Sequence, residues 1–218
     1  MILISASTNP PKLEDLPAYI QKLNTTDVDY IHCDVMDGKF VKEKTFSYKT
    51  VKEINKISSK PLDVHLMTQN PEKTYKKYIK AGANILTVHF EAFKNKEKIK
   101  KILSKIREKN CFAGLSFNPD TSIRDILPLI PFCDLLLVMS VTPGKSGQEF
   151  LSQTIERLGE INAYLKKQKL EVVVEVDGGV NGENLPKLKE NGVNMVVMGN
   201  FLFLSSDLLK TVKAIKEM

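Results

Sequence analysis

Residues 70–89 read NPEKTYKKYIKAGANILTVH, and this stretch holds the repeating unit of the fold. Its first two residues, Asn70-Pro71, suit the start of a helix, because asparagine caps helices and proline is tolerated in the first turn. Gly82 is of the type that commonly follows a helix, and the β-rich run Ile85–His89 comes next. The stretch therefore predicts a helix over Pro71–Ala81 that leads directly into a strand.

The same alternation of helix and strand extends along the whole chain. The segment Glu190–Asn194 resembles Lys80–Asn84 and holds the same place in its own unit. Strands are expected at Ile2–Ser5, Tyr30–Met36, Leu62–Met67, Ile85–His89, Phe112–Phe117, Leu135–Val141, Val172–Val176 and Met195–Met198. Helices are expected at Lys12–Leu23, Tyr48–Ile57, Pro71–Ala81, Lys96–Lys109, Ile123–Ile130, Gln148–Lys167, Glu183–Asn191 and Asp207–Glu217.

Eight strand–helix units with no linker rich in Pro, Gly or Ser predict a single α/β domain over residues 1–218. A TIM (β/α)8 barrel is the architecture expected for eight such units in a chain of this length. An open, doubly wound sheet of eight strands is the alternative. In a barrel the active site lies at the carboxyl ends of the strands, so the functional residues are expected there.

The charge of the chain argues against a nucleic-acid partner. Of its 32 basic residues only Arg107, Arg124 and Arg157 are arginines, and lysines are spread along helix-like segments such as Lys94–Lys109. This pattern is typical of a solvated surface, which also helps to attract a small anion. The three cysteines form no Cys-x-x-Cys pair, so neither disulfides nor a thiolate zinc site is indicated. With no signal peptide or membrane-spanning run indicated, a soluble cytoplasmic protein is expected.

Polar side chains gather on the inward faces of the strands Tyr30–Met36 and Leu62–Met67. Side chains alternate along a strand, and the apolar set must face the helices, so the polar set points into the barrel. Another acid, Asp177, ends a later strand at the same end of the barrel. The inward sets of the first two strands are His32, Asp34 and Met36, and Asp63, His65 and Met67.

Four of these residues make a candidate metal site, namely His32, Asp34, His65 and Asp177. Buried carboxylates are costly unless paired or bound to a cation, and two of them balance one divalent cation beside two neutral imidazoles. One ion per chain is expected; Zn²⁺ suits this mixed donor set, whereas ligand type leaves Fe²⁺, Mn²⁺ and Co²⁺ open. His89, which shares a strand face with Glu91, either orients a ligand or is structural, and is left outside the ligand set.

Glycines in the last loops indicate a phosphate subsite. They occur as Gly144-Lys145-Ser146-Gly147, Gly178-Gly179 and Gly199-Asn200, after three consecutive expected strands. Barrels hold phosphate with these loops and the start of a short extra helix, expected near Phe201–Leu204. A nucleotide-binding P-loop is not indicated, because Met139 stands where that motif needs glycine. Met36, Met67 and Met139 either fill the core or form a dry wall around the cavity.

Four segments resemble the ribulose-phosphate 3-epimerase family, in order and over nearly the whole chain: His32–Val41, Asp63–Met67, Leu137–Phe150 and Val176–Val180. The resemblance implies a TIM barrel that interconverts ribulose 5-phosphate and xylulose 5-phosphate in the pentose phosphate pathway, generally as a homo-oligomer. It also implies metal binding by the four candidate ligands, with Asp34 and Asp177 as the two acid/base groups. Ser7 matches the serine that contacts substrate in this family, and His65 is expected to contact substrate as well as metal.

The loops depart from the family pattern, whereas the metal centre does not. Lys42-Glu43 stands where the family has Pro-Asn, Lys145-Ser146 replaces Phe-Gly in the phosphate loop, and Asn200 replaces a serine. An allulose-6-phosphate 3-epimerase is therefore an alternative. Two alternatives come from other classes: a noncatalytic phosphosugar-binding barrel, which has no use for both aspartates, and a phosphosugar lyase, which needs a lysine on an inward strand position.

Overall fold

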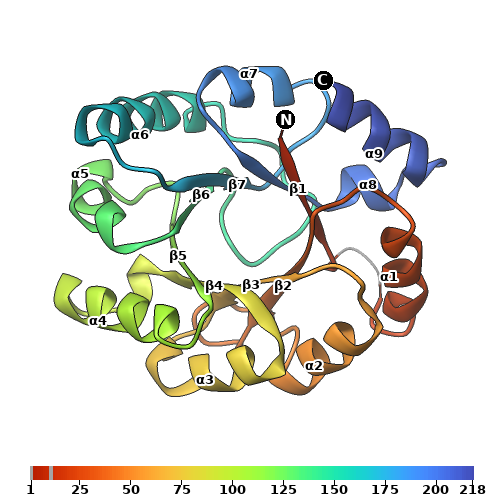
Figure 1. The fold of residues 1–218 in the computed structure, drawn as a ribbon, viewed down its shortest axis with the longest axis horizontal. Helices are drawn as coiled ribbons and strands as arrows, with labels where there is room; N and C mark the ends of the chain where they lie inside the picture. The colour runs from red at the N-terminus through yellow and green to blue at the C-terminus, as the bar shows by residue number, and fades with distance from the viewer. Residues whose placement is uncertain (1, 10–11) are drawn as a thin grey trace.

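The structure, a computed structural model, describes residues 2–9 and 12–218. The strands in these ranges are all parallel and pair in chain order, and β8 pairs with β1, so the sheet closes into a barrel (Figure 1). They are β1 (Leu3–Ser7), β2 (Tyr30–Met36), β3 (Leu62–Met67), β4 (Ala83–His89), β5 (Phe112–Phe117), β6 (Leu135–Met139), β7 (Val173–Asp177) and β8 (Met195–Met198). The closure confirms the TIM barrel and excludes the open sheet.

Helices surround the barrel as a ring (Figure 1). They are α1 (Leu16–Asn24), α2 (Tyr48–Ile57), α3 (Pro71–Ala81), α4 (Lys96–Arg107), α5 (Ile123–Ile126), α6 (Thr154–Gln168), α7 (Leu185–Glu190), α8 (Asn200–Phe203) and α9 (Leu208–Glu217), with 3-10 turns η1 (Phe90–Ala92) and η2 (Leu127–Phe132). Helix α3 spans Pro71–Ala81 and is followed by Gly82, as predicted. Throughout the described ranges, every helix falls short of the length and apolarity needed to cross a bilayer.

Helix α1 begins at Leu16 and not at Lys12, and α7 spans Leu185–Glu190 and not Glu183–Asn191. Two larger differences from the predicted helices have identifiable reasons. The helix expected over Ile123–Ile130 is divided into α5 and η2, because Pro128 and Pro131 cannot donate helical hydrogen bonds. Helix α6 begins at Thr154 and not at Gln148, because the intervening residues belong to the loop after β6. The Gln148 side chain donates to two carbonyls of that loop, at 2.7 and 2.9 Å, and so holds it in place.

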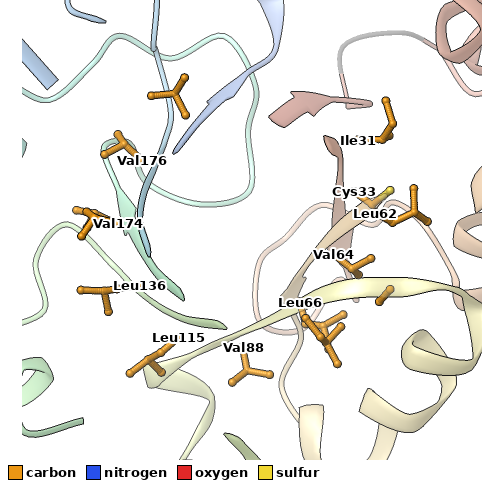
Figure 2. Close-up of a cluster of buried hydrophobic side chains, with 14 of the residues drawn as sticks. Ile31, Cys33, Leu62, Val64, Leu66, Val88, Leu115, Leu136, Val174 and Val176 are labelled. Carbon is orange, nitrogen blue, oxygen red and sulfur yellow. The ribbon is translucent and has the colours of Figure 1, made fainter. Parts of the chain in front are cut away.

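Apolar side chains separate into an outer and an inner cluster, as strand alternation predicts. The outer cluster includes Ile31 and Cys33 of β2 and Val64 of β3, which lie among the apolar side chains of the helices. Figure 2 shows labelled members of this cluster arranged around the outside of the barrel. The buried members of the inner cluster on strands are Ile85 of β4, Leu135, Leu137 and Met139 of β6, and Met195 of β8. The inward positions left to β2, β3 and β7 are mostly polar and carry the site described below.

One inward position has no room for a side chain. A Cβ atom added to Gly114 of β5 would lie 2.1 Å from Oγ1 of Thr87 on the neighbouring strand β4. Thr87 is itself fully buried, so its side chain cannot swing into solvent to make space. Close packing of β4 against β5 therefore requires glycine here.

We expect Gly114→Ala to lower the free energy of unfolding by about 1–3 kcal/mol, the usual cost of overpacking a dense core. Chemical denaturation followed by circular dichroism measures the change. Gly159→Ala is the matched control: Gly159 lies in α6, and an added Cβ would meet only Asn191 Oδ1 at 3.9 Å. That control should stabilise the protein by about 0.5–1 kcal/mol through helix propensity. Equal or greater stability of Gly114→Ala would contradict the close approach of the two strands.

Candidate functional site

The four predicted ligand residues lie together at the carboxyl ends of β2, β3 and β7. Asp34 is paired in register with His65 on the adjacent strand, and Asp177 is the last residue of β7. His32, one strand repeat below Asp34, turns its side chain into the same centre. Each of the four offers one nitrogen or oxygen atom, and these atoms all lie within 4.8 Å of one another.

The donor atoms point at one another from opposite sides of this centre. Nε2 of His32 and Nδ1 of His65 each lie 3.2 Å from Oδ1 of Asp34. The same two nitrogens lie 3.9 and 3.7 Å from Oδ2 of Asp177. Two imidazole nitrogens and two carboxylate oxygens in this arrangement are a donor set that fits a divalent transition-metal ion.

The two aspartates of the site differ in pKa. Burial opposes ionisation of Asp34, but the charge and hydrogen bonds of His32 and His65 outweigh it and hold the pKa of Asp34 below its usual range. At Asp177, burial and the nearby charge of Asp34 raise the pKa to about 7. At neutral pH the pair therefore holds one ionised carboxylate and one group close to its own pKa.

A buried acid, Asp63, contacts the ring nitrogen of His32 that faces away from the centre. Nδ1 of His32 lies 2.5 Å from Oδ2 of Asp63, and the hydroxyl of Ser5 donates to the same oxygen at 2.8 Å. Burial opposes ionisation of Asp63 too, yet His32 outweighs it and lowers the pKa of Asp63. Burial and the charge of Asp63 raise the pKa of the nearby acid Glu175 well above its usual value, which favours its neutral form. The structure thus gives His32 an anionic hydrogen-bond partner on the side away from the centre.

A second histidine lies behind His65. Nε2 of His89 lies 2.8 Å from Nε2 of His65, and the two ring planes differ by 24°. Burial lowers the pKa of His89 to about 4, which keeps it neutral, and Glu91 accepts a hydrogen bond at its Nδ1. His89 is therefore outside the ligand set, as the sequence analysis left it.

A cavity of about 700 Å³ joins this centre to the glycine-containing loops. Asp34 and Asp177 line it, whereas the two histidine ligands are fully buried below its surface. Its wall also contains the other residues expected to contact substrate, namely Ser7, Met36, Met67, Met139, Gly144, Lys145, Ser146, Gly147, Gly178, Gly179, Gly199 and Asn200. The two aspartates of the predicted metal site and the predicted phosphate residues thus line one cavity.

The loop after β7 packs tightly against the loop after β6. Gly179 has φ +63°, and a Cβ atom there would lie 2.6 Å from the backbone nitrogen of Phe150. A larger residue would separate the two loops that the sequence analysis assigned to phosphate. Asn200 reaches the same region from α8, since its Nδ2 lies 2.8 Å from where a Cβ of Gly147 would stand.

Comparison with known proteins places the whole assembly in one family. The model of the "Ribulose-phosphate 3 epimerase family" matches residues 3–203. The chain belongs to the ribulose-phosphate 3-epimerase family. It is therefore an isomerase that acts on a carbohydrate derivative.

Curated epimerases of this family align with almost the full chain. The ribulose-phosphate 3-epimerase of Chlamydia pneumoniae is 36% identical over 209 residues, which cover 95% of this chain and 90% of that protein. The Bacillus subtilis ribulose-phosphate 3-epimerase is 34% identical over 217 residues and covers 99% of both chains. These alignments extend the epimerase resemblance well beyond the four motifs.

Solved structures with low identity share the fold. The 3-keto-L-gulonate-6-phosphate decarboxylase of Vibrio cholerae superposes with a TM-score of 0.73 at 13% identity, over 99% of this chain and 96% of that one. The 3-hexulose-6-phosphate synthase of Salmonella typhimurium gives 0.72 at 16% identity, over 99% and 97%. At such identities the likeness concerns the barrel alone.

Sequence reasoning did not assign a role to several residues of this epimerase-family site. Asp63 contacts His32, Glu175 lies close to both without a hydrogen-bond partner, and Glu91 contacts His89. The signal for Asp63 and Glu175 was present, because both alternate in phase with a predicted ligand two residues further along the strand. No such signal marks the partners of Glu91, which come from the loop after β5.

Proposed function

We propose that the chain is a metal-dependent 3-epimerase of a ketose phosphate, which interconverts D-ribulose 5-phosphate and D-xylulose 5-phosphate. The observation that supports this most is that Asp34 and Asp177 both line the cavity and face one donor centre. Inversion of a carbon next to a ketone needs an acid and a base on opposite faces of a planar intermediate. Relatives named ribulose-phosphate 3-epimerase supply the substrate pair.

His32, Asp34, His65 and Asp177 would hold the metal ion. When bound, a divalent cation supplies positive charge to the oxygens that become negative as the substrate loses its C3 proton. Zn²⁺ suits the donor set best, and the same donors accept Fe²⁺, Mn²⁺ or Co²⁺.

The two aspartates exchange roles during one turnover. In one direction Asp34, ionised, takes the C3 hydrogen as a proton, and the C–H electron pair moves into a C2–C3 enediolate. Asp177, protonated, then gives its proton to the opposite face of C3, which inverts the carbon and leaves Asp177 ionised. The reverse reaction begins from that state, so the proton count balances in both directions.

Binding of the phosphate, which lies away from the reacting carbon, would orient the substrate in the cavity. The glycine-containing loops after β6, β7 and β8 line the far part of the same cavity and would receive the phosphate. Lys145 lies exposed in the first of these loops, where the family usually has an aromatic residue. A lysine there adds positive charge near the phosphate.

A phosphosugar lyase is a less suitable function for this cavity. Of the cavity-lining residues, the one lysine is Lys145, which lies in a loop, and the strand positions that point inward carry none within the described ranges. The single-domain organisation over residues 1–218, the homo-oligomer and the cytoplasmic location stay predictions.

Purified protein should contain about one divalent transition-metal ion per chain and lose epimerase activity on exhaustive chelation. Each of Zn²⁺, Fe²⁺, Mn²⁺ and Co²⁺ is then added back singly, with metal content measured by elemental analysis. Activity is assayed on ribulose 5-phosphate and allulose 6-phosphate in parallel, which separates the two candidate substrates. Full activity in protein without metal would overturn the metal dependence.

Isotope exchange should separate the two acids. In Asp177→Asn the carboxylate of Asp34 remains, so one epimer should exchange its C3 hydrogen with solvent deuterium while epimerisation falls by far more than tenfold, about 1.4 kcal/mol of barrier. Asp34→Asn should show the same behaviour with the other epimer. Because both residues are proposed ligands, metal content must be measured in each variant. A metal-replete variant that epimerises at near wild-type rate refutes this acid/base assignment.

Lys145→Ala should raise KM for the phosphorylated substrate about two- to fivefold at low salt, the range for an exposed ion pair. The difference should shrink as salt rises, because exposed charges are screened. Lys105→Ala is the control, since this exposed lysine of α4 does not line the cavity. An unchanged KM for Lys145→Ala across the salt range would show that Lys145 does not contact the phosphate.

A further inference from the structure

We propose, on the basis of the metal centre proposed above, that His89 and Glu91 are positioning residues for His65. They form a relay of hydrogen bonds that keeps a hydrogen on Nε2 of His65 and leaves its Nδ1 free to bind the metal ion. The relay begins at the centre and ends on the backbone of the loop after β5. Neither His89 nor Glu91 lines the cavity that contains Asp34 and Asp177.

The ring of His65 presents its two nitrogens to different partners. Nδ1 faces the centre, 3.2 Å from Oδ1 of Asp34, and Nε2 faces away from it, 2.8 Å from Nε2 of His89. Both rings are fully buried, so water cannot replace either contact. Two nitrogens at this distance share one hydrogen, so one ring must donate and the other must accept.

Glu91 decides which ring of the pair donates. Its Oε2 lies 3.1 Å from Nδ1 of His89, and its Oε1 accepts hydrogen bonds from the Asn118 backbone N–H, at 2.8 Å, and from the Thr121 hydroxyl. A carboxylate with these partners can only accept from His89. His89 therefore donates from Nδ1 to Glu91, and its Nε2 is placed to accept the hydrogen of His65.

Metal binding by His65 requires the same placement of hydrogens along the relay. A metal ion binds only a bare nitrogen, so a neutral ligand His65 must carry its hydrogen on Nε2. That hydrogen points at the bare Nε2 of His89, and each link then has one donor and one acceptor. If the hydrogen of His65 moved to Nδ1, His89 would have to donate from Nε2 and would face Glu91 with a bare, buried Nδ1. The relay thus disfavours the form of His65 that cannot bind metal.

The far end of the relay is held firmly in place. The guanidinium of Arg157 on α6 donates to the Thr121 carbonyl at 2.7 Å and lies over the ring of Phe117. On the other side, the ring of Phe40 packs against His89 with centroids 4.8 Å apart. These contacts hold in place both Thr121, which donates to Glu91, and the ring of His89.

The test is Zn²⁺ affinity, measured by competition with a chromophoric chelator, in wild type, Glu91→Gln and the control Glu97→Gln. In Glu91→Gln the amide oxygen must still accept from Asn118, so the amide NH₂ faces His89 Nδ1 and forces the opposite hydrogen order. Zn²⁺ binding should weaken about 10- to 100-fold. Glu97 lies 80% exposed on α4, and its substitution should leave the affinity unchanged.

A double substitution distinguishes a role of Glu91 in the hydrogen-bond relay from a purely structural role. In a His89→Gln background the amide oxygen accepts from His65 without help from Glu91, so adding Glu91→Gln should change Zn²⁺ affinity less than twofold. A merely structural Glu91 would weaken binding equally in both backgrounds, and that result would overturn the relay. Affinity within twofold of wild type in Glu91→Gln alone would also overturn it.

Nitrogen-15 NMR of Zn²⁺-loaded wild type tests the relay without any variant. His89 should carry its hydrogen on Nδ1 and His65 should bind Zn²⁺ through Nδ1; a hydrogen on Nε2 of His89 would refute the relay. Failure of wild type to bind Zn²⁺ or any other divalent ion would instead refute the metal centre itself. The two proposals therefore fail by different results.

Discussion

Two carboxylates and two imidazoles share one buried centre, and each can remain there only because the others do. An isolated charge at such a depth is very costly, whereas an acid facing two imidazoles is compensated. The compensation depends on barrel closure, since Asp34 and His65 come from adjacent strands but Asp177 comes from β7, across the barrel. The order of strands around the barrel is thus a condition for the electrostatics, and not merely their framework.

The interior of the barrel is divided between packing and chemistry. The buried strand residues of the inner apolar cluster come from β4, β6 and β8, whereas the four donor residues come from β2, β3 and β7. Each histidine of the centre has an acid on its outer side, but by different routes. His32 contacts Asp63 directly, whereas a second imidazole separates His65 from Glu91. The two ligand histidines are therefore supported by different elements of the barrel.

Much of this arrangement follows from the sequence because it rests on local rules. Alternation along β2 and β3 identifies the inward residues, and all four predicted ligand residues lie together in the structure. What escapes sequence reasoning depends on contacts between distant segments. The start of α6 is set by Gln148 bonding to its own loop, and the acceptor role of Glu91 is set by Asn118, 27 residues away. The spacing of residues along the sequence does not reveal such contacts.

The histidines of the centre are fully buried, while the aspartates form the floor of the open cavity. An ion at this centre would therefore face this cavity, which the proposed substrate would also occupy. Substrate in the cavity would block release of the ion on that side, so turnover and metal retention would be coupled kinetically. Scarcity of substrate, and not only scarcity of metal, would then govern how quickly the site empties.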